Sequence, residues 1–166
     1  MAVETLVSVE EYLHTSYDPE VEYVDGVLVE RNVGDWQHSL IQSNLIVALN
    51  RQHPYIYAVP ALRSQTSQTR YRVPDVCVLL SRPNARILLN AAFLVIEILS
   101  EQDSMTKMME KLDEYEKKGV AHIWVIDPRL GKTSVYSGGD LREVKEDRIA
   151  TADSRLELTR EEVFQQ

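Results

Sequence analysis

Apolar and polar residues follow strand-type patterns along much of the chain. β-forming segments flank Asp25-Gly26, which predicts a β-hairpin at residues 21–30 with a two-residue turn. The runs at 76–80 and 93–99 are apolar on both faces, as is typical of central strands. Further strands are predicted at residues 55–62, 68–73, 121–126 and 132–136.

Other segments carry the signals of helices. A helix is predicted at residues 36–52, where His38 lies on an apolar stripe formed by Ile41, Leu45, Ala48 and Leu49. Another is predicted at residues 104–118, because Gly119 is a typical C-terminal signal. Capping-box spacings begin at Ser8 and at Thr159, and the first predicts a short helix at residues 10–14.

These elements predict an α/β fold with a mixed sheet. Strands and helices do not alternate strictly, which argues against a doubly wound nucleotide-binding fold. The chain has no glycine-rich phosphate-binding loop. Its 166 residues fit one domain, residues 1–166, with a substantial core.

Composition and charge limit the possible partners. The net charge of −8 argues against binding of nucleic acid by a generally basic surface. Residues 61–90, however, hold five arginines and one acidic residue, Asp75. These arginines are either solvated surface residues or phosphate-positioning groups, and we take Arg70 and Arg72 as candidate substrate-binding residues.

Neither a membrane segment nor a disulfide is expected. The longest uncharged apolar run is too short to span a bilayer, and the first residues lack a basic-then-apolar signal. Cys77 is the single cysteine and lies in an apolar strand. We therefore expect a cytoplasmic protein without a membrane partner.

Two isolated carboxylates are the main chemical signal. Asp75 and Glu97 are the sole charges in their apolar strand segments. An unpaired carboxylate in such a place costs several kcal/mol, so each needs a cation. Lys111 lies at the edge of the apolar arc of the predicted helix 104–118 and could reach inward. Two carboxylates suit Mg²⁺, and a nearby lysine suits phosphodiester hydrolysis.

Structural explanations remain open for each of these residues. Asp75 could cap a turn after Pro74, and Glu97 could form a structural ion pair with Lys111. His38 could be a core histidine with satisfied hydrogen bonds. Glu22 could be a solvated strand residue. The histidines show no zinc-ligand spacing.

Seven short motifs, taken in order, resemble the Uma-two family of endonucleases within the PD-(D/E)XK nuclease superfamily. The resemblance extends from Ser8 to about Phe164. The motifs are Glu22-Tyr-Val-Asp-Gly26, His38 near the start of a helix, Val73-Pro-Asp-Val76, Glu97-Ile-Leu-Ser100, Lys111 with Tyr115, Gly119-Val120 and Trp124-Val-Ile-Asp-Pro128.

The resemblance implies a restriction-endonuclease-like fold, in which a central mixed sheet is flanked by helices and preceded by a β-hairpin. It also implies metal binding by Asp75 and Glu97, with Lys111 as the catalytic lysine. In the wider superfamily that lysine stands two residues after the glutamate, where this chain has Leu99. The resemblance further implies that Glu22 and His38 border the site, and we include both among the candidate catalytic residues.

The expected function is therefore that of a Mg²⁺-dependent endonuclease that hydrolyses DNA, with Mn²⁺ as a possible substitute. A homodimer is expected, since cutting both strands requires two sites. The alternative is a catalytically silent protein that binds nucleic acid or regulates another protein while it keeps the nuclease fold. A third, weaker option is a hydrolase of nucleotides or other small phosphate esters.

Overall fold

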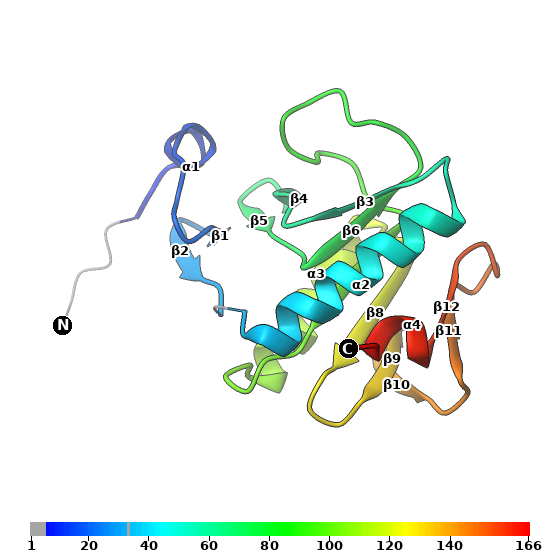
Figure 1. Ribbon diagram of the computed structural model, residues 1–166. Helices are drawn as coiled ribbons and strands as arrows, with labels where there is room; N and C mark the ends of the chain where they lie inside the picture. Colours follow the sequence, from blue (N-terminus) through cyan, green and yellow to red (C-terminus); the bar gives the residue numbers. More distant parts are fainter. Residues whose placement is uncertain (1–5, 33) are drawn as a thin grey trace.

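The computed structural model describes residues 6–32 and 34–166, and its centre is a six-stranded sheet (Figure 1). The strands follow the order β10-β9-β8-β7-β6-β3. β7 and β8 are parallel, while the other neighbours pair antiparallel. The predicted mixed sheet is thus confirmed. Its strands are β3 (Tyr57–Pro60), β6 (Val76–Leu79), β7 (Leu94–Ile98), β8 (His122–Asp127), β9 (Lys132–Ser137) and β10 (Asp140–Val144).

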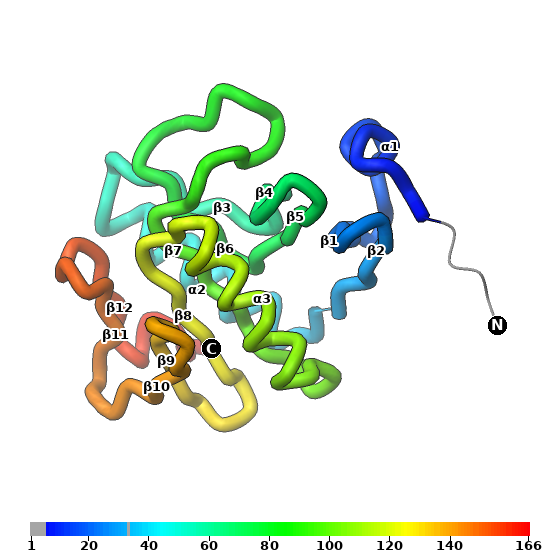
Figure 2. The backbone as a smooth tube through the Cα atoms, turned by 180° about the vertical axis from the view of Figure 1, so that it is seen from behind, coloured from blue at the N-terminus to red at the C-terminus, as the bar shows by residue number. Residues whose placement is uncertain are grey.

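Helices cover both faces of this sheet. α2 (Trp36–Gln52) lies across the face seen in Figure 1, together with α4 (Arg160–Phe164). α3 (Met105–Lys118) lies across the opposite face, seen from behind in Figure 2. α3 also forms the crossover connection that the parallel strands β7 and β8 require.

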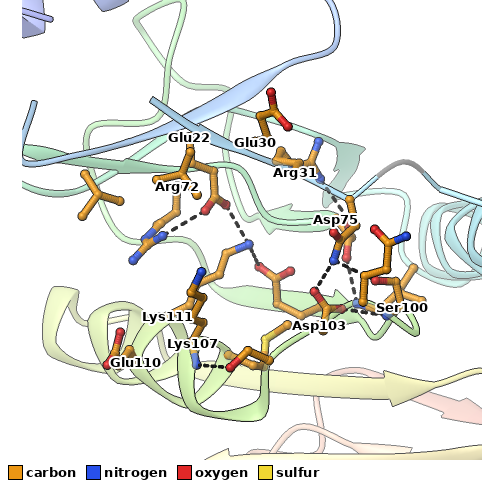
Figure 3. A pocket seen from close by; sticks show the side chains of 18 of the residues that line it. Glu22, Glu30, Arg31, Arg72, Asp75, Ser100, Asp103, Lys107, Glu110 and Lys111 are labelled. Carbon is orange, nitrogen blue, oxygen red and sulfur yellow. Dashed lines mark hydrogen bonds and ion pairs between the residues drawn. The ribbon is translucent and has the colours of Figure 1, made fainter. Parts of the chain in front are cut away.

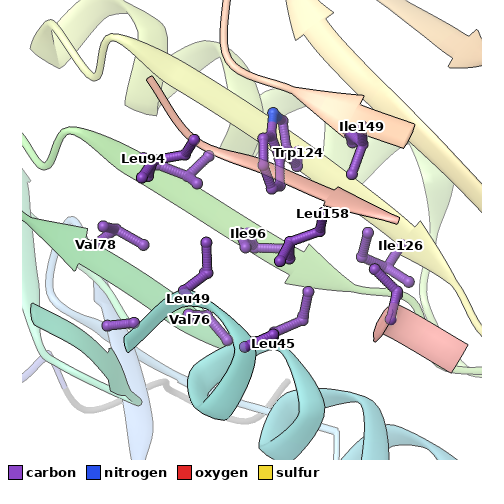
Figure 4. Packing of buried hydrophobic residues seen from close by; sticks show 14 of the residues in the cluster. Leu45, Leu49, Val76, Val78, Leu94, Ile96, Trp124, Ile126, Ile149 and Leu158 are labelled. Carbon is purple, nitrogen blue, oxygen red and sulfur yellow. The ribbon is translucent and has the colours of Figure 1, made fainter. Parts of the chain in front are cut away.

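Strand alternation decides which side chains each helix meets. Ile96 and Trp124 belong to the core cluster under α2, which Figure 4 shows. Val95 and Ile123 belong to the cluster under α3. Glu97 follows Val95 by two positions and therefore also points toward α3, as the sequence predicts.

A second sheet, with the order β2-β1-β5-β4, lies beside the first. Its β1 and β2 form the predicted hairpin, and Asp25 and Gly26 both have positive φ, 50° and 96°. Tyr12 of α1 (Val9–His14) stacks on Tyr23 of β1, with ring centroids 5.1 Å apart. The four strands are β1 (Val21–Val24), β2 (Val27–Glu30), β4 (Ser64–Ser67) and β5 (Arg70–Arg72).

Some strands were not predicted. β4 is a run of four polar residues and has no hydrophobic alternation, yet it pairs with β5. β11 (Arg148–Ala150) and β12 (Glu157–Thr159) are three-residue strands, too short to show a period. The strand expected at 55–62 is shorter, because Ala61 has a φ of 47° that ends it. Within the described residues, no helix has the length and apolar character needed to cross a membrane.

Candidate active site

A pocket of about 360 Å³ lies between the hairpin sheet, the end of β7 and α3 (Figure 3). Its lining is mostly polar and charged. It includes all five candidate catalytic residues named from the sequence, which are Glu22, His38, Asp75, Glu97 and Lys111. They come from β1, α2, the residue before β6, β7 and α3. The fold therefore gathers side chains from five separate segments at one place.

Asp75 lies in a bend before β6, as Pro74 in the sequence suggests, and is 6% exposed. Its Oδ2 accepts a hydrogen bond of 2.8 Å from the backbone N–H of Ile98. Its Oδ1 lies 2.9 Å from Nη2 of Arg31 and 3.3 Å from Nε2 of His38. The carboxylate therefore reaches across to β7, next to Glu97, and we find no local turn that it caps.

Glu97 is 2% exposed on the α3 face of β7. The hydroxyl of Tyr115 donates a 2.7 Å hydrogen bond to its Oε1, and Nζ of Lys111 lies 2.9 Å from the same atom. Burial raises the pKa of Glu97 to about 7, despite the opposing charge of Lys111, and the negative charge of Asp75 adds to the increase. Burial thus disfavours the charged form of this carboxylate, and a divalent cation beside it would favour that form.

Lys111 points inward from α3 and pairs with Glu97, as predicted, but its second carboxylate partner is Glu22 and not Asp75. Its Nζ lies 2.7 Å from Glu22 and 2.9 Å from Glu97, while Asp75 pairs with Arg31 and His38. Burial lowers the pKa of Lys111, but the charges of Glu22, Glu97 and Asp75 outweigh this and raise it. Lys111 is therefore a stable ammonium group at neutral pH. The ion pair with Glu97 that the structural explanation expected is present.

Glu22 is buried at 4% exposure, so the alternative of a solvated strand residue is wrong. It accepts hydrogen bonds from Arg72, at 3.0 Å, and from the backbone N–H of Val73, also at 3.0 Å. Burial raises its pKa, but Lys111 and Arg72 outweigh burial and lower it. Glu22 is thus an ionised anchor that holds Lys111 toward Glu97.

His38 lies in the first turn of α2 and lines the pocket. Its hydrogen bond to Asp75 raises its pKa, although burial opposes this. For Asp75, burial raises the pKa, but the hydrogen bond and charge of His38 help to lower it below the usual value. The histidine therefore keeps Asp75 ionised and oriented.

The two candidate substrate-binding arginines are engaged by carboxylates. Arg72 lines the pocket but binds Glu114 with both Nε and Nη2, at 2.9 and 2.7 Å, as well as Glu22. Arg70 lies away from the pocket lining and pairs with Asp25 and Glu114, at 2.6 and 2.7 Å. A role in phosphate binding stays a prediction for both, and each would first have to leave these ion pairs.

The donor set fits a magnesium ion completed by other ligands. Asp75, just before β6, and Glu97, on the neighbouring strand β7, are hard oxygen donors, and both line the pocket. Across residues 6–32 and 34–166, no group of three or more histidine, cysteine, aspartate or glutamate side chains could hold a metal alone. Mg²⁺ commonly takes one or two carboxylates and completes its shell with water and substrate phosphate, which matches this arrangement.

Several residues of the site had no clear signal in the sequence. Arg31 follows the hairpin and contacts Asp75 across 44 positions of sequence. Tyr115 stands in the motif with Lys111, but nothing in the sequence shows that its hydroxyl donates to Glu97. Glu114 follows Lys111 by three positions, so helical spacing could have placed the two on adjacent faces.

Comparisons with known proteins agree with this geometry. The model of the Uma2 family, described as "Putative restriction endonuclease", matches residues 9–165. A solved structure from Anabaena variabilis ATCC 29413, titled as a "putative nuclease belonging to DUF820", has a TM-score of 0.80 and 25% identity, over 95% of this chain and 97% of that one. A search of curated proteins found no match. The fold, the ordered motifs and the family match lead to one conclusion: the chain belongs to the Uma2 family and has its restriction-endonuclease-like fold.

Proposed function

We propose that this protein is a metal-dependent endonuclease that hydrolyses phosphodiester bonds in DNA. The observation that carries the proposal is the convergence of Asp75, Glu97 and Lys111 from three separate elements onto one pocket. A purely structural ion pair needs one cation for one anion. Here the carboxylates of Glu22, Asp75 and Glu97 are all buried, and all three line the same pocket. This arrangement is more typical of a cation site than of a folding device.

In the proposed reaction, Asp75 and Glu97 would hold the cation by their carboxylate oxygens. Bound Mg²⁺ would polarise the scissile phosphate and lower the pKa of the attacking water. Attack forms a new bond from the water oxygen to phosphorus and breaks one phosphate ester bond, and the leaving oxygen takes up a proton. Lys111 stays protonated, so it is suited to stabilise the negative charge that develops on the phosphate rather than to remove a proton.

Glu22 and His38 serve this reaction as positioning residues. Glu22 holds the ammonium group of Lys111 beside Glu97, and His38 holds Asp75 in its ionised form. A homodimer, a single domain over residues 1–166 and a cytoplasmic location are further parts of the proposal. The homodimer rests on the need for two sites to cut a duplex, and light scattering of the purified protein tests it.

The test is cleavage of supercoiled plasmid, single-stranded DNA and RNA, with Mg²⁺, Mn²⁺ or EDTA. We expect metal-dependent cleavage that falls on the order of 100-fold or more in Asp75→Ala and in Glu97→Ala. Asp140→Ala and Glu146→Ala are matched controls, because both acids are exposed and lie outside the pocket. Cleavage that survives in the two site variants would refute the assignment, and an inactive wild type would favour the silent alternative.

A further inference from the structure

Arg31 is the side chain that most directly blocks a cation from Asp75. Its Nη2 lies 2.9 Å from Oδ1 of Asp75, on the pocket side of the carboxylate (Figure 3). Oδ2 is already held by the backbone N–H of Ile98, which cannot move without β7. A divalent cation on Asp75 would therefore compete for Oδ1 and would repel the guanidinium group beside it.

Of the arginine and lysine side chains that pair with Asp75, Glu22 or Glu97, Arg31 is the one placed to move. Arg72 is held by Glu22 and Glu114, and Lys111 by Glu22 and Glu97. The Arg31 side chain is 21% exposed, comes from the segment between β2 and α2, and pairs with Asp75 alone among the described residues. Its guanidinium group can therefore swing away without breaking a second ion pair.

The neighbouring residue fixes the backbone at this point. Nδ2 of Asn32 donates to Oγ of Ser100 at 2.8 Å and to Oδ1 of Asp103 at 2.6 Å, and both partners also line the pocket. This anchor keeps the Cα of Arg31 at the mouth of the pocket while its side chain moves. A guanidinium group at such a place presents paired N–H donors that match the oxygens of a phosphate.

We propose that Arg31 is a phosphate-binding arginine that Asp75 holds in the metal-free protein. A divalent cation on Asp75 displaces the guanidinium group, which then binds a non-bridging oxygen of the nucleic-acid backbone. This inference deepens the proposed function and rests on it. It makes Arg31 the link between two binding events, since the protein gains its phosphate ligand only when the metal has arrived.

Two binding measurements test this without relying on cleavage. The first is calorimetric titration of metal-stripped protein with Mn²⁺. We expect Arg31→Ala to bind Mn²⁺ roughly fivefold more tightly than wild type, because a competitor for Asp75 is gone. The second is the anisotropy of a fluorescent single-stranded oligonucleotide in Ca²⁺ over a series of salt concentrations. There Arg31→Ala should bind more weakly, and the slope of log K against log salt should fall by about 0.7.

Controls separate this inference from general effects of charge and folding. Arg82→Ala removes the same charge from an exposed residue outside the pocket, and it should match wild type in both measurements. Arg31→Gln removes the charge but keeps a hydrogen-bond donor near Asp75, so it carries the test if Arg31→Ala does not fold. Circular dichroism in EDTA checks folding of every variant.

The outcomes distinguish the two proposals. If wild type binds neither Mn²⁺ nor the oligonucleotide, the proposed function fails and this inference fails with it. If wild type binds both and the Arg31 variants behave like Arg82→Ala, the role of Arg31 is refuted while the nuclease proposal stands. Weaker Mn²⁺ binding in the Arg31 variants would also refute it, since Arg31 would then support the metal site instead of competing for it.

Discussion

Replacing Lys111 by methionine removes a buried positive charge while it keeps most of the side-chain volume. The lysine side chain is 12% exposed and lies within 2.9 Å of both Glu22 and Glu97. Glu22 would keep Arg72 and the backbone N–H of Val73 as partners. Glu97 would keep the hydroxyl of Tyr115. The cost therefore falls mainly on Glu97.

The expected size follows from the loss of one partner of a buried pair, which typically costs about 3–5 kcal/mol. We expect about 3 kcal/mol for Lys111→Met at pH 8, because Glu97 can relieve part of the cost by taking up a proton. For a chain of this length that corresponds to a fall in Tm of roughly 6–12 °C. Urea unfolding in EDTA measures the change, and Lys107→Met, at an exposed position on the same helix, should have little effect.

A second substitution tests where the cost arises. Adding Glu97→Gln to Lys111→Met should restore most of the lost stability, because the uncompensated charge is then gone. Adding Glu22→Gln instead should restore little, since Glu97 would stay uncompensated and Arg72 would lose one of its two carboxylate partners. Equal rescue by the two, or no destabilisation by Lys111→Met at pH 8, would refute the view that Lys111 chiefly compensates Glu97.

Three further predictions concern the residues around the site. Burial raises the pKa of Glu114, but the hydrogen bonds and the positive charge of Arg72 outweigh burial and lower the pKa. The ionised Glu114 therefore stabilises the fold above the unfolded pKa of about 4.3, and this stabilisation is lost as the pH falls through the lower folded pKa. Urea midpoints between pH 6 and pH 3 should therefore fall less steeply in Glu114→Gln than in wild type, and parallel curves would contradict this. Tyr115→Phe should lower the free energy of unfolding by about 1–2 kcal/mol in urea titrations, because the buried Oε1 of Glu97 loses a donor, whereas an unchanged midpoint would mean that water replaces it. Gly119→Ala should lower Tm by a few degrees, measured by calorimetry, because Gly119 ends α3 with a φ of 101° that costs a residue with Cβ roughly 1 kcal/mol; a Tm equal to that of wild type would show that the end of α3 can rearrange.

Local patterns in the sequence were enough for the main elements and for one side of the site. The helix at residues 36–52 has the predicted bounds, since its cap and apolar stripe are both local. The alternation in β7 placed Glu97 toward α3, and helical spacing turned Lys111 inward. Each of these features depends on residues within one element, so the sequence carries them directly.

The pairing of charges could not be predicted in the same way. Which carboxylate meets Lys111 depends on how the hairpin sheet sits against α3, and this is set by packing between distant segments. The sequence therefore named Asp75 as a partner of Lys111, where the fold places Glu22. The same reason explains why Arg31 went unnoticed, because nothing near it in sequence indicates that it meets Asp75.

The charged residues of the pocket also fasten the two sheets together. Lys111 on α3 joins Glu97 of the larger sheet to Glu22 of the hairpin, and Arg72 of β5 continues the row to Glu114. The side chains that we propose for catalysis therefore also connect the two sheets. The exchange rates of the amide protons of β1 and β5 should consequently show whether these ion pairs are intact, since hydrogen exchange there measures how often the hairpin sheet detaches. Loss of a single charge would make this part of the molecule open more often while the larger sheet remains closed.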